Sequence, residues 1–182
     1  MINFENEIFL ISDTWLGRSN IIEIANRPFK TVKEMNETII SNWNNLVSPE
    51  DTVIHLGNFA WDPKTAKKAL SKLNGNIFFM EGSSGDLPLA ELQDDKKFKN
   101  KISFIENEIL SITEHDVILS HYPLSAWLGD VSNTFHVHGY TTYSHFTDLT
   151  KMLRFNLCCD FWGFKPVKIS TLKDLIYEQK KL

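Results

Sequence analysis

Cysteine is scarce in this chain of 182 residues, which contains only Cys158 and Cys159. Two adjacent thiols cannot build a disulfide framework, so the sequence predicts a protein of a reducing compartment. Long apolar stretches are also missing, because none approaches the roughly 18 residues that a membrane-spanning helix needs. The first residues lack the basic start and the apolar core of a secretion signal. These absences predict a cytoplasmic protein that does not associate with a membrane.

An excess of basic residues is absent as well. Lysine and arginine number 19 against 23 aspartates and glutamates, which gives a net charge of −4 and an isoelectric point near 5.9. This balance argues against a protein that coats DNA, so nucleic acid is not an expected partner. Hydrophobic residues make up 42% and charged residues 23%, as in an ordinary globular chain, and the length suits a single domain over residues 1–182.

Apolar runs and helix-start signals alternate in the first half of the chain. Strands are predicted over 8–11, 52–56 and 77–80. Between them, Thr31 and Asp62 are residues that cap the start of a helix. This order is typical of a parallel sheet with crossover helices. The first of these helices has an apolar face at helical spacing, formed by Val32, Met35, Ile39, Trp43 and Leu46.

Strands without helices between them predict a second sheet in the other half. Residues 102–105 and 109–113 are spaced like a hairpin, and further strands are predicted over 117–120 and 155–159. A last amphipathic helix follows Ser170 and Thr171, with Leu172, Leu175 and Ile176 inward. The sequence therefore predicts an α/β fold, a four-layer αββα sandwich in which two mixed β-sheets pack face to face between helices.

Polar and glycine-rich segments follow these strands, where open α/β sheets bind their ligands. In order, they contain Ile11-Ser12-Asp13-Thr14, Arg27-Pro28-Phe29, His55-Leu56-Gly57-Asn58-Phe59, Ser120-His121-Tyr122-Pro123 and Cys159-Asp160-Phe161-Trp162. On these segments the chain resembles, over nearly its whole length, the small calcineurin-like metallophosphoesterases of bacteria and their phages. The resemblance implies the four-layer fold and a site where two divalent ions, roughly 3.5–4 Å apart, hydrolyse a phosphoester.

Most positions that the resemblance assigns to metal ligands are altered. Asp13 and His121 keep the family's residue types, and Asn58 stands where the carboxylate that bridges both metals belongs. These three residues are the remnant of the implied metal site. An amide offers an oxygen but not the charge that offsets the repulsion between two cations. The other altered ligand or catalytic positions are Trp15, Ser83, Ser84, Tyr140 and Thr142.

Trp15 and Tyr140 are bulky enough to fill the space that metals would use, so we expect no intact catalytic group and no bound cofactor. The leading hypothesis is a pseudoenzyme that serves as a binding or scaffolding module, with a protein partner. If the gene is phage-encoded, that partner would be a host or virion component in the host cytoplasm. Exposed aromatic side chains could anchor such an interface, and the candidates are Trp61, Trp127, Tyr143 and Trp162.

Two alternatives stay open at this point. One is a residual phosphoesterase that binds a single Mn, Zn or Fe ion through Asp13, Asn58 and His121, with Asp86 as a candidate for the place of a lost carboxylate. The other is a protein that holds a phosphate or nucleotide without cleaving it, through Asn58, Ser83, Ser84 and nearby main-chain N–H groups.

The remaining histidines and cysteines have simpler interpretations. His55 lies within a predicted strand and is expected to be a hydrogen-bonded core residue. Strand alternation places His136 and His138 on one face, and with His145 they could form a relocated zinc site, although spacing specifies no third ligand. Of the two cysteines on the predicted strand 155–159, one is expected to point inward and one outward.

Overall fold

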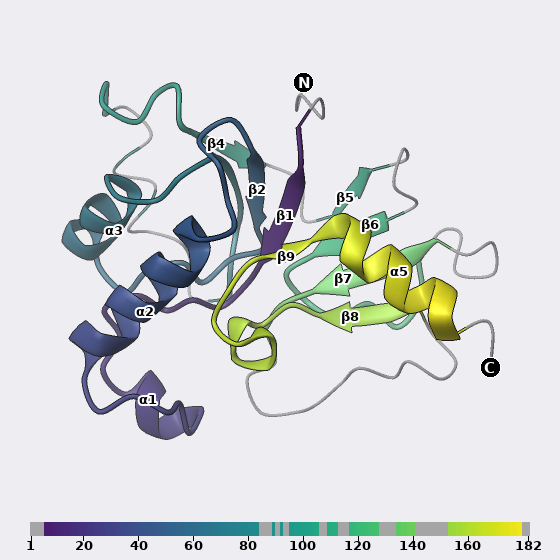
Figure 1. Ribbon diagram of the computed structural model, residues 1–182, viewed down its shortest axis with the longest axis horizontal. Helices are drawn as coiled ribbons and strands as arrows, with labels where there is room; N and C mark the ends of the chain where they lie inside the picture. The colour runs from purple at the N-terminus through teal and green to yellow at the C-terminus, as the bar shows by residue number, and fades with distance from the viewer. Residues whose placement is uncertain are drawn as a thin grey trace.

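The computed structural model describes residues 6–83, 89, 92, 95–105, 109–112, 117–127, 134–140 and 153–179, with only the backbone at 109, 110, 178 and 179. Two β-sheets form its centre, and helices α1, α2 and α3 lie together on one side of the first sheet (Figure 1). The first sheet has five strands in the order β4 (Ile102–Ile105), β3 (Asn76–Met80), β2 (Thr52–His55), β1 (Ile8–Ile11) and β9 (Val167–Lys168). The second has the order β5 (Ile109–Ile112), β6 (Val117–Ser120), β7 (Phe135–His138) and β8 (Arg154–Asn156).

Both sheets are mixed, as the sequence predicts. In the first sheet β1 to β4 are parallel, and β9 pairs antiparallel with β1. In the second sheet β6, β7 and β8 are parallel, and β5 pairs antiparallel with β6. Parallel neighbours place their carboxyl ends along one edge of a sheet, so the loops that follow them gather there.

Capping side chains mark the starts of two of the helices. The helices are α1 (Ile21–Ile24), α2 (Val32–Asn44), α3 (Pro63–Leu70) and α5 (Ile169–Gln179). Thr31 Oγ1 accepts a hydrogen bond from the N–H of Glu34 at the start of α2, and Asp62 accepts one from Thr65 N–H at the start of α3. The predicted starts of α2 and α3 are confirmed. The start predicted after Ser170 and Thr171 is wrong, because α5 begins at Ile169 and both residues lie within its first turn.

Each of two predicted apolar helix faces includes one residue that is not buried. Helix α2 buries Met35, Ile39 and Trp43, but it ends at Asn44, so Leu46 lies beyond it and is 41% exposed. In α5, Leu172 and Ile176 are buried, whereas Leu175 is 41% exposed because it lies off the buried stripe.

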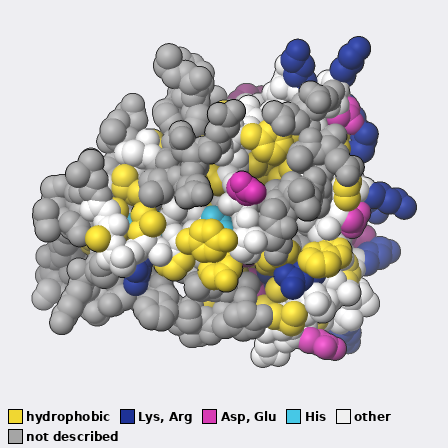
Figure 2. Space-filling view, turned by 180° about the vertical axis from the view of Figure 1, so that it is seen from behind, with side chains coloured by type: hydrophobic (Ala, Val, Ile, Leu, Met, Phe, Trp, Pro, Cys, Tyr) yellow, Lys and Arg dark blue, Asp and Glu magenta, His cyan; other side chains and the backbone are white. Residues whose placement is uncertain are grey.

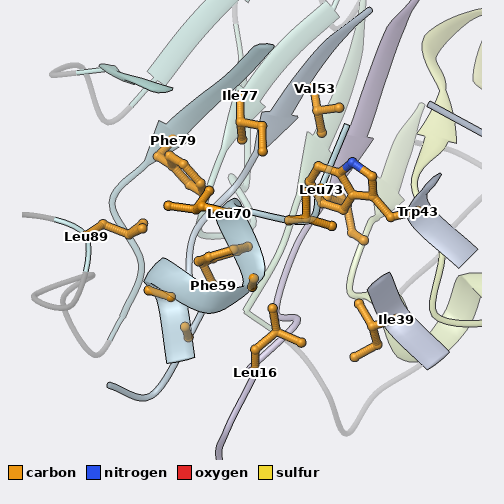
Figure 3. Packing of buried hydrophobic residues seen from close by; sticks show 14 of the residues in the cluster. Leu16, Ile39, Trp43, Val53, Phe59, Leu70, Leu73, Ile77, Phe79 and Leu89 are labelled. Atoms are coloured by element: carbon orange, nitrogen blue, oxygen red, sulfur yellow. The ribbon is translucent and has the colours of Figure 1, made fainter. Parts of the chain in front are cut away.

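The hydrophobic core consists of two clusters on opposite faces of the first sheet. Figure 3 shows the cluster under α2 and α3, where Trp43 and Leu73 lie near Val53 and Ile77 of the sheet. The second cluster lies between the two sheets and includes Leu10 of β1, Val137 of β7 and, from α5, Leu172 and Ile176. Each face of the first sheet is therefore fully covered, which explains why its strands are almost continuously apolar.

The predicted hairpin over 102–113 is wrong. Strand β4 pairs with β3 in the first sheet, whereas β5 pairs with β6 in the second. The chain therefore crosses from one sheet to the other between these strands, and adjacency in the sequence did not reveal this crossing.

The prediction for the cysteines is also wrong. Strand β8 ends at Asn156, and Cys159 begins a 3₁₀ turn over Cys159–Trp162, so strand alternation does not apply and both thiols are buried. The Cys158 thiol donates to Asp160 at 3.0 Å.

The outward face of the second sheet is partly polar. It carries His136, His138 and Arg154, and the buried indole of Trp127 packs against the ring of His136.

In the part of the chain that the structure describes, no helix has both the length and the apolar character needed to cross a bilayer.

Candidate functional site

Five loops that follow strands bring polar residues together. Asp13 follows β1, Asn58 follows β2, Ser83 follows β3, His121 follows β6 and Tyr140 follows β7. Hydrogen bonds connect all five, so residues from both sheets form one polar network. The structure thus brings together Asp13, Asn58 and His121, the three residues that the sequence predicts as a metal-site remnant.

Asn58 lies at the centre of this network. Its Nδ2 donates to Asp13 Oδ1 at 2.8 Å and to Ser83 Oγ at 3.1 Å, and it lies 3.3 Å from His121 Nε2. The second oxygen of Asp13 accepts from Ser12 Oγ at 2.6 Å and from the N–H of Tyr140 at 2.8 Å. Neutral donors therefore satisfy both oxygens of a carboxylate that is 1% exposed.

The tautomer of His121 follows from its two partners. Nδ1 lies 2.6 Å from the carbonyl oxygen of Leu56, which can only accept, so Nδ1 carries the hydrogen. Nε2 then accepts the N–H of Ser83 at 2.9 Å. In this tautomer the imidazole is neutral, and its free lone pair, on Nε2, already accepts a hydrogen bond from within the protein.

Four residues of the site have a left-handed backbone. The φ angles are 57° at Asp13, 49° at Trp15, 60° at Asn58 and 70° at Tyr140. Aspartate and asparagine tolerate this region, whereas a tryptophan or tyrosine there is strained, at a cost of about 1–3 kcal/mol each. Such strain collects at functional sites, because the surrounding structure must hold it in place.

Two glycines allow the loops to approach so closely. A Cβ at Gly82 would overlap the backbone nitrogen and the side chain of Asn58, and one at Gly139 would overlap Ser12 Oγ and lie 2.8 Å from Asp13 Oδ2. Neither glycine could carry a side chain without moving a residue of the network.

A buried arginine fixes the loop that carries Asp13. Arg27 donates to the carbonyl oxygens of Asp13 at 2.7 Å and Thr14 at 2.9 Å. Its Nε and Nη2 also bind both oxygens of Asp160 at 2.8 Å, in a pair whose side chains are 0% and 9% exposed. The bidentate geometry ties the loop after β1 to the 3₁₀ turn after β8.

His55 is a satisfied core histidine, as the sequence predicts. The Thr14 hydroxyl donates to Phe59 O at 2.8 Å, so His55 Nε2, 3.0 Å away, donates to Thr14 Oγ1. Its Nδ1 accepts the N–H of Gly57 at 3.2 Å. Burial, followed by the nearby His121, lowers the pKa of His55 to about 3, so this ring is neutral.

His136 and His138 share one strand face, and their rings stack with centroids 5.4 Å apart. His136 contacts Ile118 O and accepts the N–H of Leu124, whereas the buried His138 Nε2 has no hydrogen-bond partner among the residues that the structure describes. Burial lowers the pKa of both rings to about 4, with a further lowering from Arg154. The third member of the hypothetical zinc site, His145, lies outside the described residues, as do Asp86, Ser84, Thr142 and Tyr143.

The predicted interface aromatics separate into different environments. Trp61 is 55% exposed, whereas Trp127 is buried and donates to Thr134 O, and Trp162 is half-buried and donates to Asn156 O. The indole of Trp15 belongs to the cluster under α2 and α3 and lies against Trp61 and the Arg18 guanidinium, at 6.4 Å and 4.2 Å between centres. Its bulk serves this packing.

Sequence reasoning did not identify Tyr122 and Tyr140 as a pair of exposed aromatic rings beside the network. Figure 2 shows a face of the molecule on which hydrophobic side chains gather around a histidine. Tyr122 and Tyr140, 50% and 48% exposed, pack at 4.8 Å from each other, and both contact the ring of His121. Ser12 and Arg27 were also not predicted to bind Asp13, although both lie in segments that carry the resemblance.

The donor set decides what the site can hold. Among the residues that the structure describes, no three side chains of His, Cys, Asp or Glu gather closely enough to hold a metal ion. Asp13 and His121 are the one carboxylate and the one imidazole of the network, and both accept hydrogen bonds from the protein. Two divalent ions need several such ligands and a carboxylate between them, so these residues do not fit a two-metal centre.

The fold and the site define the class: an α/β protein of two mixed sheets with a closed polar network at the strand ends. No model of a protein family matches the chain. The chain is 33% identical over 181 residues to the "Uncharacterized protein MJ1445" of Methanocaldococcus jannaschii, covering 96% of this chain and 93% of that protein. It therefore belongs to the same family as MJ1445.

A solved structure resembles it as well. The crystal structure of the protein of unknown function AQ665 from Aquifex aeolicus superposes with a TM-score of 0.70, over 94% of this chain and 100% of that chain. At 21% sequence identity, this similarity establishes a shared fold.

Proposed function

We propose that this protein is a catalytically degenerate member of the calcineurin-like metallophosphoesterase superfamily that acts as a binding or scaffolding module for a protein partner. The observation that carries the proposal is the hydrogen bond of 2.8 Å from Asn58 Nδ2 to Asp13 Oδ1. In the implied active site these two positions would both be carboxylates that share a cation. An amide N–H now donates a hydrogen bond directly to Asp13, so a contact within the protein joins the two loops at the point where the implied site would hold a cation.

The strained backbone supports the same origin. Trp15 and Tyr140 keep a left-handed φ that neither residue type favours, at positions where the resemblance implies metal-ligating histidines. A fold that had never carried a reactive site there would have no evident reason to hold a bulky aromatic residue in this conformation.

Exposed aromatic residues in the loops that follow the strands support a binding role. Tyr122, Tyr140 and Trp61 are each about half exposed, and Arg18 lies over the rings of Trp15 and Trp61 at 4.2 and 5.0 Å. Tyrosine, tryptophan and arginine are the residue types that contribute most to protein interfaces, because they offer a large contact area with polar groups.

Turnover measurements test the loss of catalysis. The purified protein with manganese is expected to hydrolyse bis(p-nitrophenyl) phosphate no faster than buffer with manganese, and metal analysis is expected to find less than one ion per chain. Asp13→Ala is the matched control and should give the same background rate. Manganese-dependent turnover that Asp13→Ala abolishes would contradict the proposal and favour a residual mononuclear enzyme.

Restoring the implied bridging residue tests the role of Asn58. Asn58→Asp is expected to destabilise the protein by about 1–3 kcal/mol at pH 7, because Asp13 loses its donor and faces a second carboxylate. Lowering the pH should reduce the difference in Tm between the variant and the wild type at the same pH, and manganese at pH 7 should raise the Tm of the variant, both measured by differential scanning fluorimetry.

Asn42→Asp is the control for this substitution. It also replaces an amide donor, to Gly163 O at 3.1 Å, but lies away from the network, so manganese should leave its Tm unchanged. Equal responses of the two variants to manganese would show that residue 58 has no special relation to cations.

A further inference from the structure

A groove between α2 and α3 forms a second candidate site. It encloses about 230 Å³ and is lined by both helices and by the loop after β1. Leu16, Ile40 and Ala69 supply apolar lining, and Lys33, Lys68 and Lys72 line it with charged side chains. None of the residues of the polar network lines this groove, so it is a separate feature of the surface.

The charge around the groove is opposite to that of the protein. Three lysines and one glutamate, Glu37, line the groove, in a chain whose net charge is −4. Glu37 pairs with Lys33 at 4.0 Å and offsets one of the three positive charges, so the lining of the groove keeps an excess of positive charge. The groove therefore complements an acidic ligand.

Two of the lysines that line the groove lack acidic partners within the described part of the chain. Lys67, which does not line the groove, pairs with Asp95, but no ion pair of Lys68 or Lys72 is found among the described residues. Lys68 belongs to α3 and Lys72 lies two residues beyond the end of that helix, and since both line the groove their like charges repel each other. An acidic group bound between α2 and α3 would relieve this repulsion.

The size of the groove indicates what kind of ligand it holds. Pockets that enclose a whole small molecule usually have about 300–1,000 Å³. A smaller groove between two helices, apolar at its base and charged around it, suits a few apolar side chains of a peptide whose backbone stays outside. From these observations we propose that the α2–α3 groove binds an acidic amphipathic segment of a partner protein, with its apolar side chains on Leu16, Ile40 and Ala69 and its carboxylates on Lys33, Lys68 and Lys72.

This proposal goes beyond the proposed function, because it requires nothing of the polar network and holds whether or not catalysis has been lost. Its test uses the full chain labelled with ¹⁵N and a fluorescein-labelled peptide in which leucines at helical spacing alternate with glutamates. We expect saturable binding by fluorescence anisotropy and amide shift changes confined to α2, α3 and the loop at Leu16. The same peptide with glutamine in place of glutamate should bind at least about tenfold more weakly.

Variants locate the interaction. Lys68→Glu with Lys72→Glu should weaken binding of the acidic peptide by tenfold or more, whereas Lys165→Glu with Lys173→Glu, the same change of charge elsewhere, should not. Val32→Asp places a carboxylate in the groove at the first turn of α2, where an acidic residue favours the helix, so the protein should fold but bind weakly.

Several outcomes would overturn the proposal. They are equal binding of the glutamine peptide, shift changes at the Tyr122 and Tyr140 face instead of the groove, or no shift changes at millimolar peptide. Shifts of the groove amides with dodecanoate but not with the peptide would assign the groove to a small anionic amphiphile and would also refute it.

Discussion

Acidification from pH 7 to pH 5 is expected to lower the free energy of unfolding by roughly 5–6 kcal/mol. The cause is three fully buried histidines: burial lowers the pKa of His55 to about 3 and of His136 and His138 to about 4. In the unfolded chain each ring would titrate near 6.5. Between these pKa values the unfolded state binds more protons than the folded state. The contribution of the three neutral histidines to stability is therefore fully present above about pH 6.5 and is lost as the pH falls towards 4.

Urea unfolding at pH 7, 6 and 5 measures this dependence, and calorimetry in two buffers measures the protons taken up. His55→Gln is the informative variant, because an amide can donate to Thr14 Oγ1 and accept from Gly57 without titrating. It should remove about a third of the pH dependence. A wild-type protein equally stable at pH 7 and pH 5 would refute the assignment, as would an unchanged slope in the variant.

Replacing Arg27 by alanine is expected to destabilise the protein by about 3–5 kcal/mol, because breaking a buried ion pair leaves its partner without compensation. Asp160 is 9% exposed and would lose both of its hydrogen bonds to the guanidinium. The carbonyl oxygens of Asp13 and Thr14 would lose their donor at the same time. Urea denaturation monitored by tryptophan fluorescence gives the change in free energy.

Two further variants make this result interpretable. Arg27→Lys keeps the charge but not the fork of donors, so an intermediate loss is expected, and this variant supplies the measurement if Arg27→Ala does not fold. Lys33→Ala removes one member of the exposed pair with Glu37 and should leave stability unchanged. If Arg27→Ala behaved like Lys33→Ala, the clamp between the loop after β1 and the 3₁₀ turn would not stabilise the fold.

Much of the fold could be predicted from local sequence. Capping residues predict where α2 and α3 begin, and apolar runs predict β1, β2 and β3, because these signals depend on neighbours a few residues away. The assignment of β4 and β5 to different sheets could not be predicted in this way. Which sheet a strand joins depends on partners distant in the sequence, and residue spacing says nothing about them.

The candidate site could likewise be predicted only in part. Residue types at strand ends, together with the resemblance, identified Asp13, Asn58 and His121 as candidate site residues. The structure places the three in one network. The main-chain N–H groups of Ser83 and Tyr140, which bind His121 and Asp13, have no sequence signal because every residue other than proline carries one. The environment of Trp15 depends on packing against Trp61 and Arg18, which also could not be deduced from its position in a motif.

The antiparallel pairing of β9 with β1 has a consequence for synthesis on the ribosome. Strand β1 is made before β9, and its free edge is covered only when residues 167–168 have been made. Until then a strongly apolar strand presents unpaired N–H and C=O groups that could pair with another nascent chain. We therefore infer that the first sheet is completed only after β9 has been made, and that loss of β9 would promote aggregation through the exposed edge of β1.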